Sequence, residues 1–114
     1  MRDYWGRAML ILGHVIDQDT AQALKSSMPK DPGKQGRDGR LTVRDTYRSR
    51  HFVRAVVGVI LAEDMEYGEI TPLTPEWIQA EAERAAPELA GFLAAQSLVV
   101  PGPPRLLLWA ESDD

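Results

Sequence analysis

Basic, aromatic and imidazole side chains recur at short intervals near the middle of the chain. Arg44, Tyr47, Arg48, His51 and Arg54 all fall between residues 44 and 54. Arginine forks bind phosphate oxygens bidentately, tyrosine stacks on nucleobases, and histidine exchanges protons near neutral pH. The set therefore predicts a site for an anionic ligand. Two alternatives remain open: a solvated surface whose arginines pair with acids elsewhere, and the active site of a metal-independent ribonuclease.

A polar loop precedes this set and carries further cations. Residues 29–40 contain two Pro, three Gly and no hydrophobic residue, which predicts a basic Pro/Gly loop over 29–41. The Gly33-Lys34-Gln35-Gly36 segment of this loop lacks the Gly-Lys-Ser/Thr ending of a P-loop. The expected nucleic-acid-binding or anion-binding surface combines the loop with the residues that follow it: Lys30, Lys34, Arg37, Arg40, Arg44, Tyr47, Arg48, His51 and Arg54.

The charges are segregated along the chain. The formal net charge is −4, which argues against a dedicated nucleic-acid-binding domain, because such domains are usually basic. Residues 25–54 nevertheless hold nine bases and three acids, whereas residues 55–114 hold two bases and eleven acids. This separation predicts an anionic partner on one face, or self-association of a basic face with an acidic one. A homo-oligomer is therefore expected.

The sequence predicts neither a metal nor a cofactor, and it assigns no catalytic residue. The chain has no cysteine, which excludes disulfides, cysteine zinc sites, iron–sulfur clusters and thiol nucleophiles. Glu63, Asp64, Glu66 and Glu69 form an acidic cluster that could supply oxygen ligands to Mg²⁺ or Ca²⁺. The spacing of these acids matches no known metal-binding loop, so metal binding is the minor interpretation.

Length and composition favour one domain over residues 1–114. No apolar run approaches the roughly 20 residues of a membrane span, and the first residues show no secretory signal pattern. Arg outnumbers Lys ten to three and Asn is absent, a bias typical of GC-rich prokaryotic or phage genomes. We therefore expect a cytoplasmic protein without membrane contact.

Two helices are expected in the first part of the chain, each with a competing strand interpretation. Over residues 4–16 the apolar side chains fall on one helical arc, although Met9–Ile16 could also form a strand. Residues 43–64 are too long for one strand and predict a helix, with Phe52–Leu61 as the competing buried strand. On that helix Tyr47, Arg48, His51 and Arg54 would share one polar stripe. A short helical piece capped by Asp19 or Thr20 is expected to extend to Leu24.

The second half of the chain has the clearest local signal. Thr74 is a predicted N-cap with Pro75 at the first helical position, and the apolar stripe then predicts one kinked helix from 75 to about 95. Pro87 falls on the solvated side of this helix. Leu98–Val100 and Leu106–Trp109 read as two short strands about a Pro/Gly turn. His14 is expected to be solvated or capping, and Trp5, Trp77 and Trp109 are expected to be core or interface anchors.

These elements predict a mainly α fold of about three principal helices with a short C-terminal β-hairpin, with an α+β fold containing a small antiparallel sheet as the alternative. The expected function is that of a small non-enzymatic binding or regulatory protein. Its basic 30–54 surface would bind nucleic acid or an acidic protein partner. A self-assembling structural or accessory-complex subunit and a metal-independent ribonuclease toxin are the alternatives.

Overall fold

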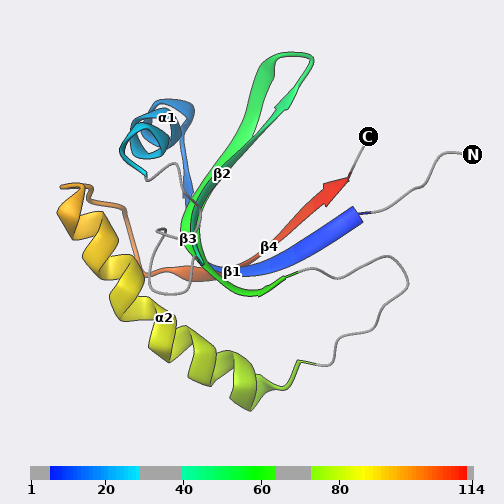
Figure 1. Ribbon diagram of the computed structural model, residues 1–114, viewed down its shortest axis with the longest axis vertical. Helices are drawn as coiled ribbons and strands as arrows, with labels where there is room; N and C mark the ends of the chain where they lie inside the picture. The colour runs from blue at the N-terminus through cyan, green and yellow to red at the C-terminus, as the bar shows by residue number, and fades with distance from the viewer. Residues whose placement is uncertain (1–5, 29–39, 64–72, 113–114) are drawn as a thin grey trace, which may run out of the picture.

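The computed structural model describes residues 6–28, 40–63 and 73–112, which form one antiparallel sheet and two helices (Figure 1). The strand order is β2-β3-β1-β4, and every neighbouring pair is antiparallel. The elements follow each other along the chain as β1 (Gly6–Ile16), α1 (Gln18–Ser27), β2 (Leu41–Arg48), β3 (His51–Glu63), α2 (Pro75–Ala95) and β4 (Arg105–Ser112).

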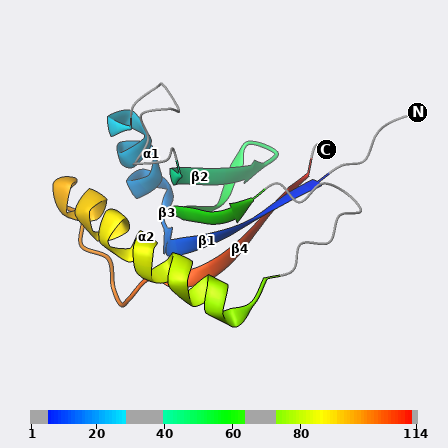
Figure 2. The same cartoon turned by 60° about the horizontal axis from the view of Figure 1, so that its bottom comes forward.

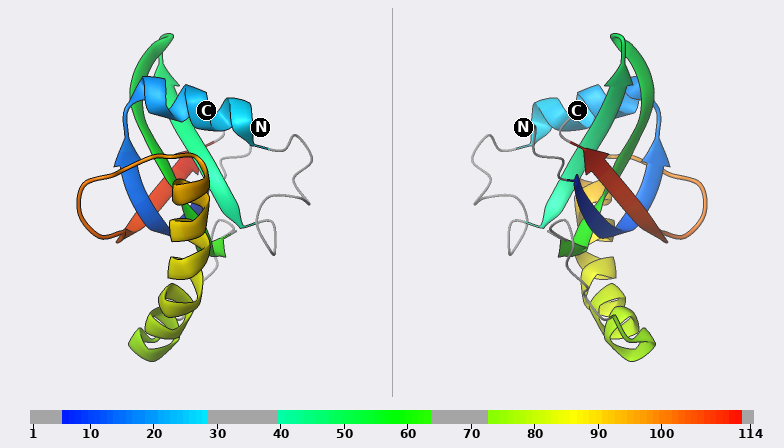
Figure 3. Two further views of the ribbon diagram at one scale, coloured as in Figure 1. Left: turned by 90° about the vertical axis from the view of Figure 1, so that its left-hand side faces the viewer. Right: turned by 90° about the vertical axis from the view of Figure 1, so that its right-hand side faces the viewer.

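Both helices lie on the same face of the sheet (Figures 2 and 3). Leu24 of α1 and Leu89 of α2 belong to one buried cluster, together with Leu12 of β1 and Val57 of β3. Since side chains alternate along a strand, the residues between these positions point to the other face. A second buried cluster occupies that face and consists of Met9, Ile11, Val56, Ile60 and Trp109. The two central strands are therefore buried on both sides.

This architecture contradicts the mainly α prediction, and the class is α+β with a larger sheet than the alternative proposed. The expected helices over 4–16 and 43–64 are instead strand β1 and the hairpin of β2 with β3. The physical reason is that β3 is buried on both faces, since every position of Ala55–Leu61 is buried. The sequence therefore lacks the alternation of apolar and polar residues that identifies a strand with one exposed face. The competing strand interpretations of Met9–Ile16 and Phe52–Leu61 are confirmed.

The helix starts depend on side-chain caps. At α2, the Thr74 hydroxyl accepts a 3.1 Å hydrogen bond from Trp77 N, and the helix continues through Pro87 to Ala95, as predicted. At α1 the predicted caps are wrong, because Asp17 Oδ1 accepts a 2.7 Å hydrogen bond from the backbone N–H of Thr20. Hydrogen bonds from the side chain and backbone of Thr20 lower the pKa of Asp17. Neither helix is long and apolar enough to cross a membrane.

The predicted C-terminal hairpin is wrong. Leu98–Val100 is not a strand, and β4 pairs with β1 instead, in an unbroken register from Gly6↔Ser112 to Gly13↔Arg105. β4 therefore finds its partner about a hundred residues upstream, and local sequence carries no signal for such a partner. Trp109 is buried as expected, Trp77 is 38% exposed, and Trp5 lies outside the described residues.

Two glycines oppose each other where the central strands approach most closely. Gly13 of β1 pairs with Gly58 of β3. A Cβ atom at Gly13 would lie 2.1 Å from the carbonyl oxygen of Val57, and one at Gly58 would lie 2.5 Å from the carbonyl oxygen of Leu12. Both obstacles are backbone atoms, which cannot rotate away. The close approach of the two strands thus requires glycine at both positions.

We predict that Gly13→Ala lowers the free energy of unfolding by about 2 kcal/mol or more, because the strands must separate to admit the methyl group. Gly91→Ala is the matched control. It adds the same methyl group at an exposed position of α2 with no atom within 4 Å, and should stabilise the protein by up to about 1 kcal/mol. Urea denaturation measures both changes. A Gly13→Ala protein as stable as the parent would contradict the assigned close approach.

Candidate functional site

The β2–β3 hairpin extends beyond the helices at one end of the molecule (Figure 1). Arg48 pairs with His51, so the turn consists of Ser49 and Arg50 only. Both turn residues have positive φ, 51° and 69°, as a type I′ turn requires. Asn and Gly are the usual residues there, and an ordinary L residue in this conformation costs roughly 1 kcal/mol or more. The Ser-Arg dipeptide therefore gave no turn signal in the sequence.

The register of the hairpin collects cations on one face. Arg44 and Arg48 lie on the same face of β2, because they are separated by an even number of residues. Thr46 pairs with Arg54, and Arg48 pairs with His51. Val53 has no partner in β2 and forms a β-bulge. Because of this extra residue, His51 and Arg54 point to the same face although three positions separate them. Arg44, Arg48, His51 and Arg54 therefore share the face that points away from the helices.

Tyr47 lies on the other face of the hairpin. Its ring contacts Phe52 edge-on at 5.9 Å between ring centroids, and its hydroxyl lies 3.4 Å from Asp45 Oδ2. The prediction that Tyr47 shares one polar stripe with Arg48, His51 and Arg54 is therefore wrong, because Tyr47 lies on the opposite face of the hairpin. The structure consequently does not assemble the Tyr–His–Arg set that a ribonuclease would use.

The exposed end of the hairpin is rich in cationic side chains. Arg48, Arg50, His51 and Arg54 are exposed, and no acid of the described chain forms an ion pair with them. Asp45 of β2 points to the helix side, where it accepts a 3.1 Å ion-paired hydrogen bond from Lys25. Arg44 is partly buried at the base of the hairpin. The exposed cations are thus available to an anionic partner.

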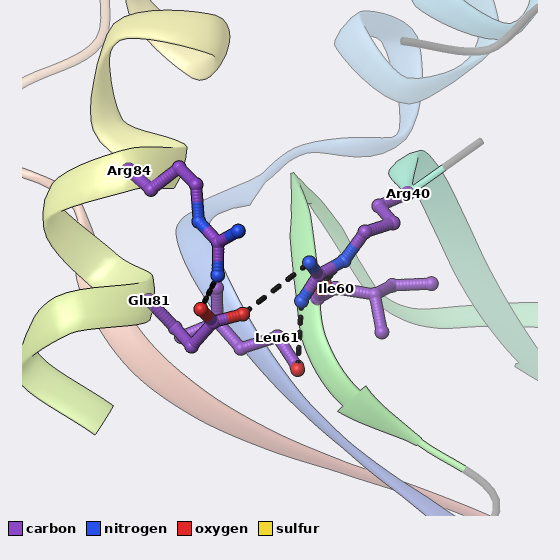
Figure 4. Close-up of polar contacts among 5 residues, drawn as sticks. All are labelled: Arg40, Ile60, Leu61, Glu81 and Arg84. Atoms are coloured by element: carbon purple, nitrogen blue, oxygen red, sulfur yellow. Dashed lines mark hydrogen bonds and ion pairs between the residues drawn. The ribbon is translucent and has the colours of Figure 1, made fainter. Parts of the chain in front are cut away.

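Arg40 has a different environment from the other candidates (Figure 4). Its guanidinium donates hydrogen bonds to the carbonyl oxygens of Ile60, at 2.5 Å, and Leu61, at 2.7 Å. It also lies 3.4 Å from Glu81 of α2, a carboxylate that is only 9% exposed and that pairs with Arg84 as well. Leu61 is the unpaired residue of a second β-bulge, opposite the step from Leu10 to Ile11. Arg40 therefore joins α2 to an irregular point of the sheet.

A pocket of about 560 Å³ lies beside this network, between α2 and the sheet. Its charged lining consists of Arg40, Glu81, Arg84 and Glu88. Two arginines and two glutamates balance in formal charge, which leaves no surplus positive charge for an anion. Glu88 Oε2 is buried without a hydrogen-bond partner in the described structure. We assign the arginines of this pocket to holding α2 in place.

Several candidates lie outside the described residues. Lys30, Lys34 and Arg37 belong to the predicted loop, and the acidic cluster from Asp64 to Glu69 is likewise not described. Within the ranges that the structure does describe, no group of three or more His, Asp or Glu side chains is close enough to hold a metal ion.

His14 is a titratable residue whose position the sequence did not predict. It lies on the helix-facing side of β1, between Leu12 and Ile16, and is only 9% exposed. This placement contradicts the expected solvated or capping histidine, because the strand period puts residue 14 in phase with the core. Burial lowers the pKa of His14, since desolvation disfavours the imidazolium.

Comparison with known proteins identifies no relative. No family model matches the chain, and none of the curated proteins or solved structures compared with it matches either. The function must therefore be argued from the geometry of this fold.

We predict that Arg40→Ala lowers the free energy of unfolding by about 3 kcal/mol, because it leaves buried Glu81 short of a partner and two carbonyl groups without a donor. Arg84→Ala removes the 66% exposed partner of the same carboxylate and should cost less than about 1 kcal/mol. Denaturant titration distinguishes the two variants. Equal losses would show that Arg40 is an ordinary surface ion-pair residue.

We also predict that stability falls with decreasing pH below about 6.5, the ordinary pKa of histidine. The folded protein holds His14 at a lower pKa, so the unfolded chain binds the additional proton in this window. Denaturation midpoints between pH 5 and 8 should therefore decrease on acidification, and His14→Gln should flatten that part of the profile. An unchanged profile in the variant would exclude His14 as the cause.

Proposed function

We propose that this protein binds nucleic acid through the cationic face of its β2–β3 hairpin. One observation carries the proposal: register and bulge place Arg44, Arg48, His51 and Arg54 on a single face, and no acid of the described chain forms an ion pair with Arg48, His51 or Arg54. Phosphate backbones supply most of the affinity of nucleic-acid complexes through contacts of this kind. The overall charge of −4 does not oppose it, because the acids of α2 lie at the other end of the molecule (Figure 1).

The turn supports the same interpretation. Arg50 adopts a positive φ at the tip of the hairpin. Glycine would be more stable in this conformation, so an arginine at this position lowers the stability of the turn. Strained residues of this kind cluster at functional sites. A long cation at the most distant point of a hairpin is well placed to reach a phosphate.

The shape of the hairpin favours duplex DNA among nucleic acids. The B-form major groove, about 12 Å wide, admits a two-stranded ribbon, whereas the corresponding groove of A-form RNA is too narrow and deep. From Arg44 to Arg48 and back to Arg54 the ribbon is long enough to span one groove, at about 3.3 Å per residue. An acidic protein surface is the competing partner, and failure of both duplex DNA and single-stranded RNA to bind would favour it.

We expect a fluorescently labelled DNA duplex of about 20 base pairs, two helical turns, to bind the protein with an affinity that falls steeply with salt. The double variant Arg48→Ala/Arg54→Ala should weaken binding and reduce the salt slope by about two, one for each lost phosphate contact. Arg84→Ala removes a charge on α2 and is the control, with an unchanged slope. Fluorescence anisotropy at several salt concentrations measures these values.

Arg50→Gly separates a functional from a structural role of the hairpin. Glycine relieves the positive φ, so the variant should unfold at a higher temperature than the parent while binding the duplex more weakly. No binding of duplex DNA or of single-stranded RNA at low salt would overturn the proposal. Unchanged binding by both hairpin variants would overturn it as well.

A further inference from the structure

Strand β4 forms an edge of the sheet that nothing in the described chain covers. It pairs with β1 on one side, and no described strand pairs with its other side. Its interior, Leu106–Ala110, has no charge, proline or bulge, the devices by which natural edge strands avoid pairing. The opposite edge, β2, is protected by Arg44, Asp45 and Arg48. The two edges of the sheet are therefore not equivalent.

Two leucines extend this edge into an apolar surface on the helix side. Trp109 and Leu107 belong to the cluster on the other face, so Leu106 and Leu108 point toward the face that carries the helices. The helix α2 packs against β3 and β1, and leaves Leu106 48% exposed and Leu108 73% exposed. A strand with an open backbone edge and an uncovered apolar face is suited to a partner strand that pairs with the edge and covers the apolar side chains.

We propose that β4 pairs with β4 of a second copy, antiparallel about Leu108, to form a dimer with a continuous eight-stranded sheet. The strand is self-complementary in this register, because each position is matched with a compatible one. Leu108 would oppose itself, and Leu106 would oppose Ala110. Position 105, an arginine, would oppose position 111, a glutamate. Any other register removes this charge match.

The two-fold axis of this dimer runs perpendicular to the sheet, so the helices of both copies lie on the same side. Leu106 and Leu108 of both copies then form one apolar strip along the seam, removed from water by each other. The β4 edge of each copy is fully used in this contact, so no further copy can be added and the assembly is a dimer. The proposal does not rest on nucleic-acid binding, because the hairpins lie at the two far ends of the extended sheet.

Light scattering coupled to size exclusion should give a mass of about twice 12.7 kDa for the parent protein at high micromolar concentration. Leu108→Lys places two like charges opposite each other and should give the monomer mass. Val99→Lys introduces the same charge at a 92% exposed residue that precedes β4, and should remain dimeric. A monomeric parent, or a dimeric Leu108→Lys variant with native circular dichroism, would overturn the proposal.

Cysteine cross-linking tests the register, since the natural chain has no cysteine to interfere. Leu108→Cys should form an intermolecular disulfide on mild oxidation, because directly opposed residues lie about 4.5–5.5 Å apart between Cα atoms. Leu106→Cys should not, because its counterpart would lie about 13 Å away along the strand. Equal cross-linking of both variants, or of neither in a dimeric sample, would overturn the register. Duplex binding measured on the Leu108→Lys protein keeps failure of the dimer distinguishable from failure of nucleic-acid binding.

Discussion

The contact between Arg40 and Glu81 adds a polar connection between α2 and the β2–β3 ladder to the apolar core that also joins them. Arg40 stands immediately before β2, and Glu81 lies one and a half turns into α2. The arginine supplies the donors that a β-bulge in β3 would otherwise lack, while the buried carboxylate supplies the charge that holds the arginine there. A buried charge is costly when it is unpaired, so α2 and the β2–β3 ladder must form together.

One end of the β2–β3 ladder is buried beside this contact, and the other end projects from the molecule (Figure 1). Near Arg40 the strands lie under α2 and contribute Leu41, Val57 and Val59 to the core. Toward the tip most side chains become exposed, and four of them are basic: Arg48, Arg50, His51 and Arg54. The other bulge of β3, at Val53, determines which side chains share a face on this projecting part. Packing of the buried end of the β2–β3 ladder against α2 thus positions the charged surface at the projecting end of the same ladder.

The two proposals concern opposite ends of the sheet and different physical forces. At the hairpin, long cations without internal partners favour an electrostatic contact that salt weakens. At β4, an uncharged strand edge and two exposed leucines favour backbone pairing and apolar burial, which salt affects little. The segregation of charge along the sequence corresponds to this division in space, since the basic hairpin and the acidic helix α2 lie apart (Figure 1).

The sequence alone determined those features that depend on neighbours in the chain. Thr74 and Pro75 identified the start of α2, and the solvated position of Pro87 showed that the helix continues. The basic character of residues 40–54 was also evident from the sequence. Tertiary structure decided the rest. Residues far away in the sequence bury β1 and β3 on both faces. Apolar residues therefore do not alternate with polar ones along these strands, so the sequence pattern did not distinguish a strand from a helix. The pairing of β4 with β1, the burial of His14 and the shared face of Arg48 and Arg54 depend on register, which is set by contacts between residues far apart in the sequence.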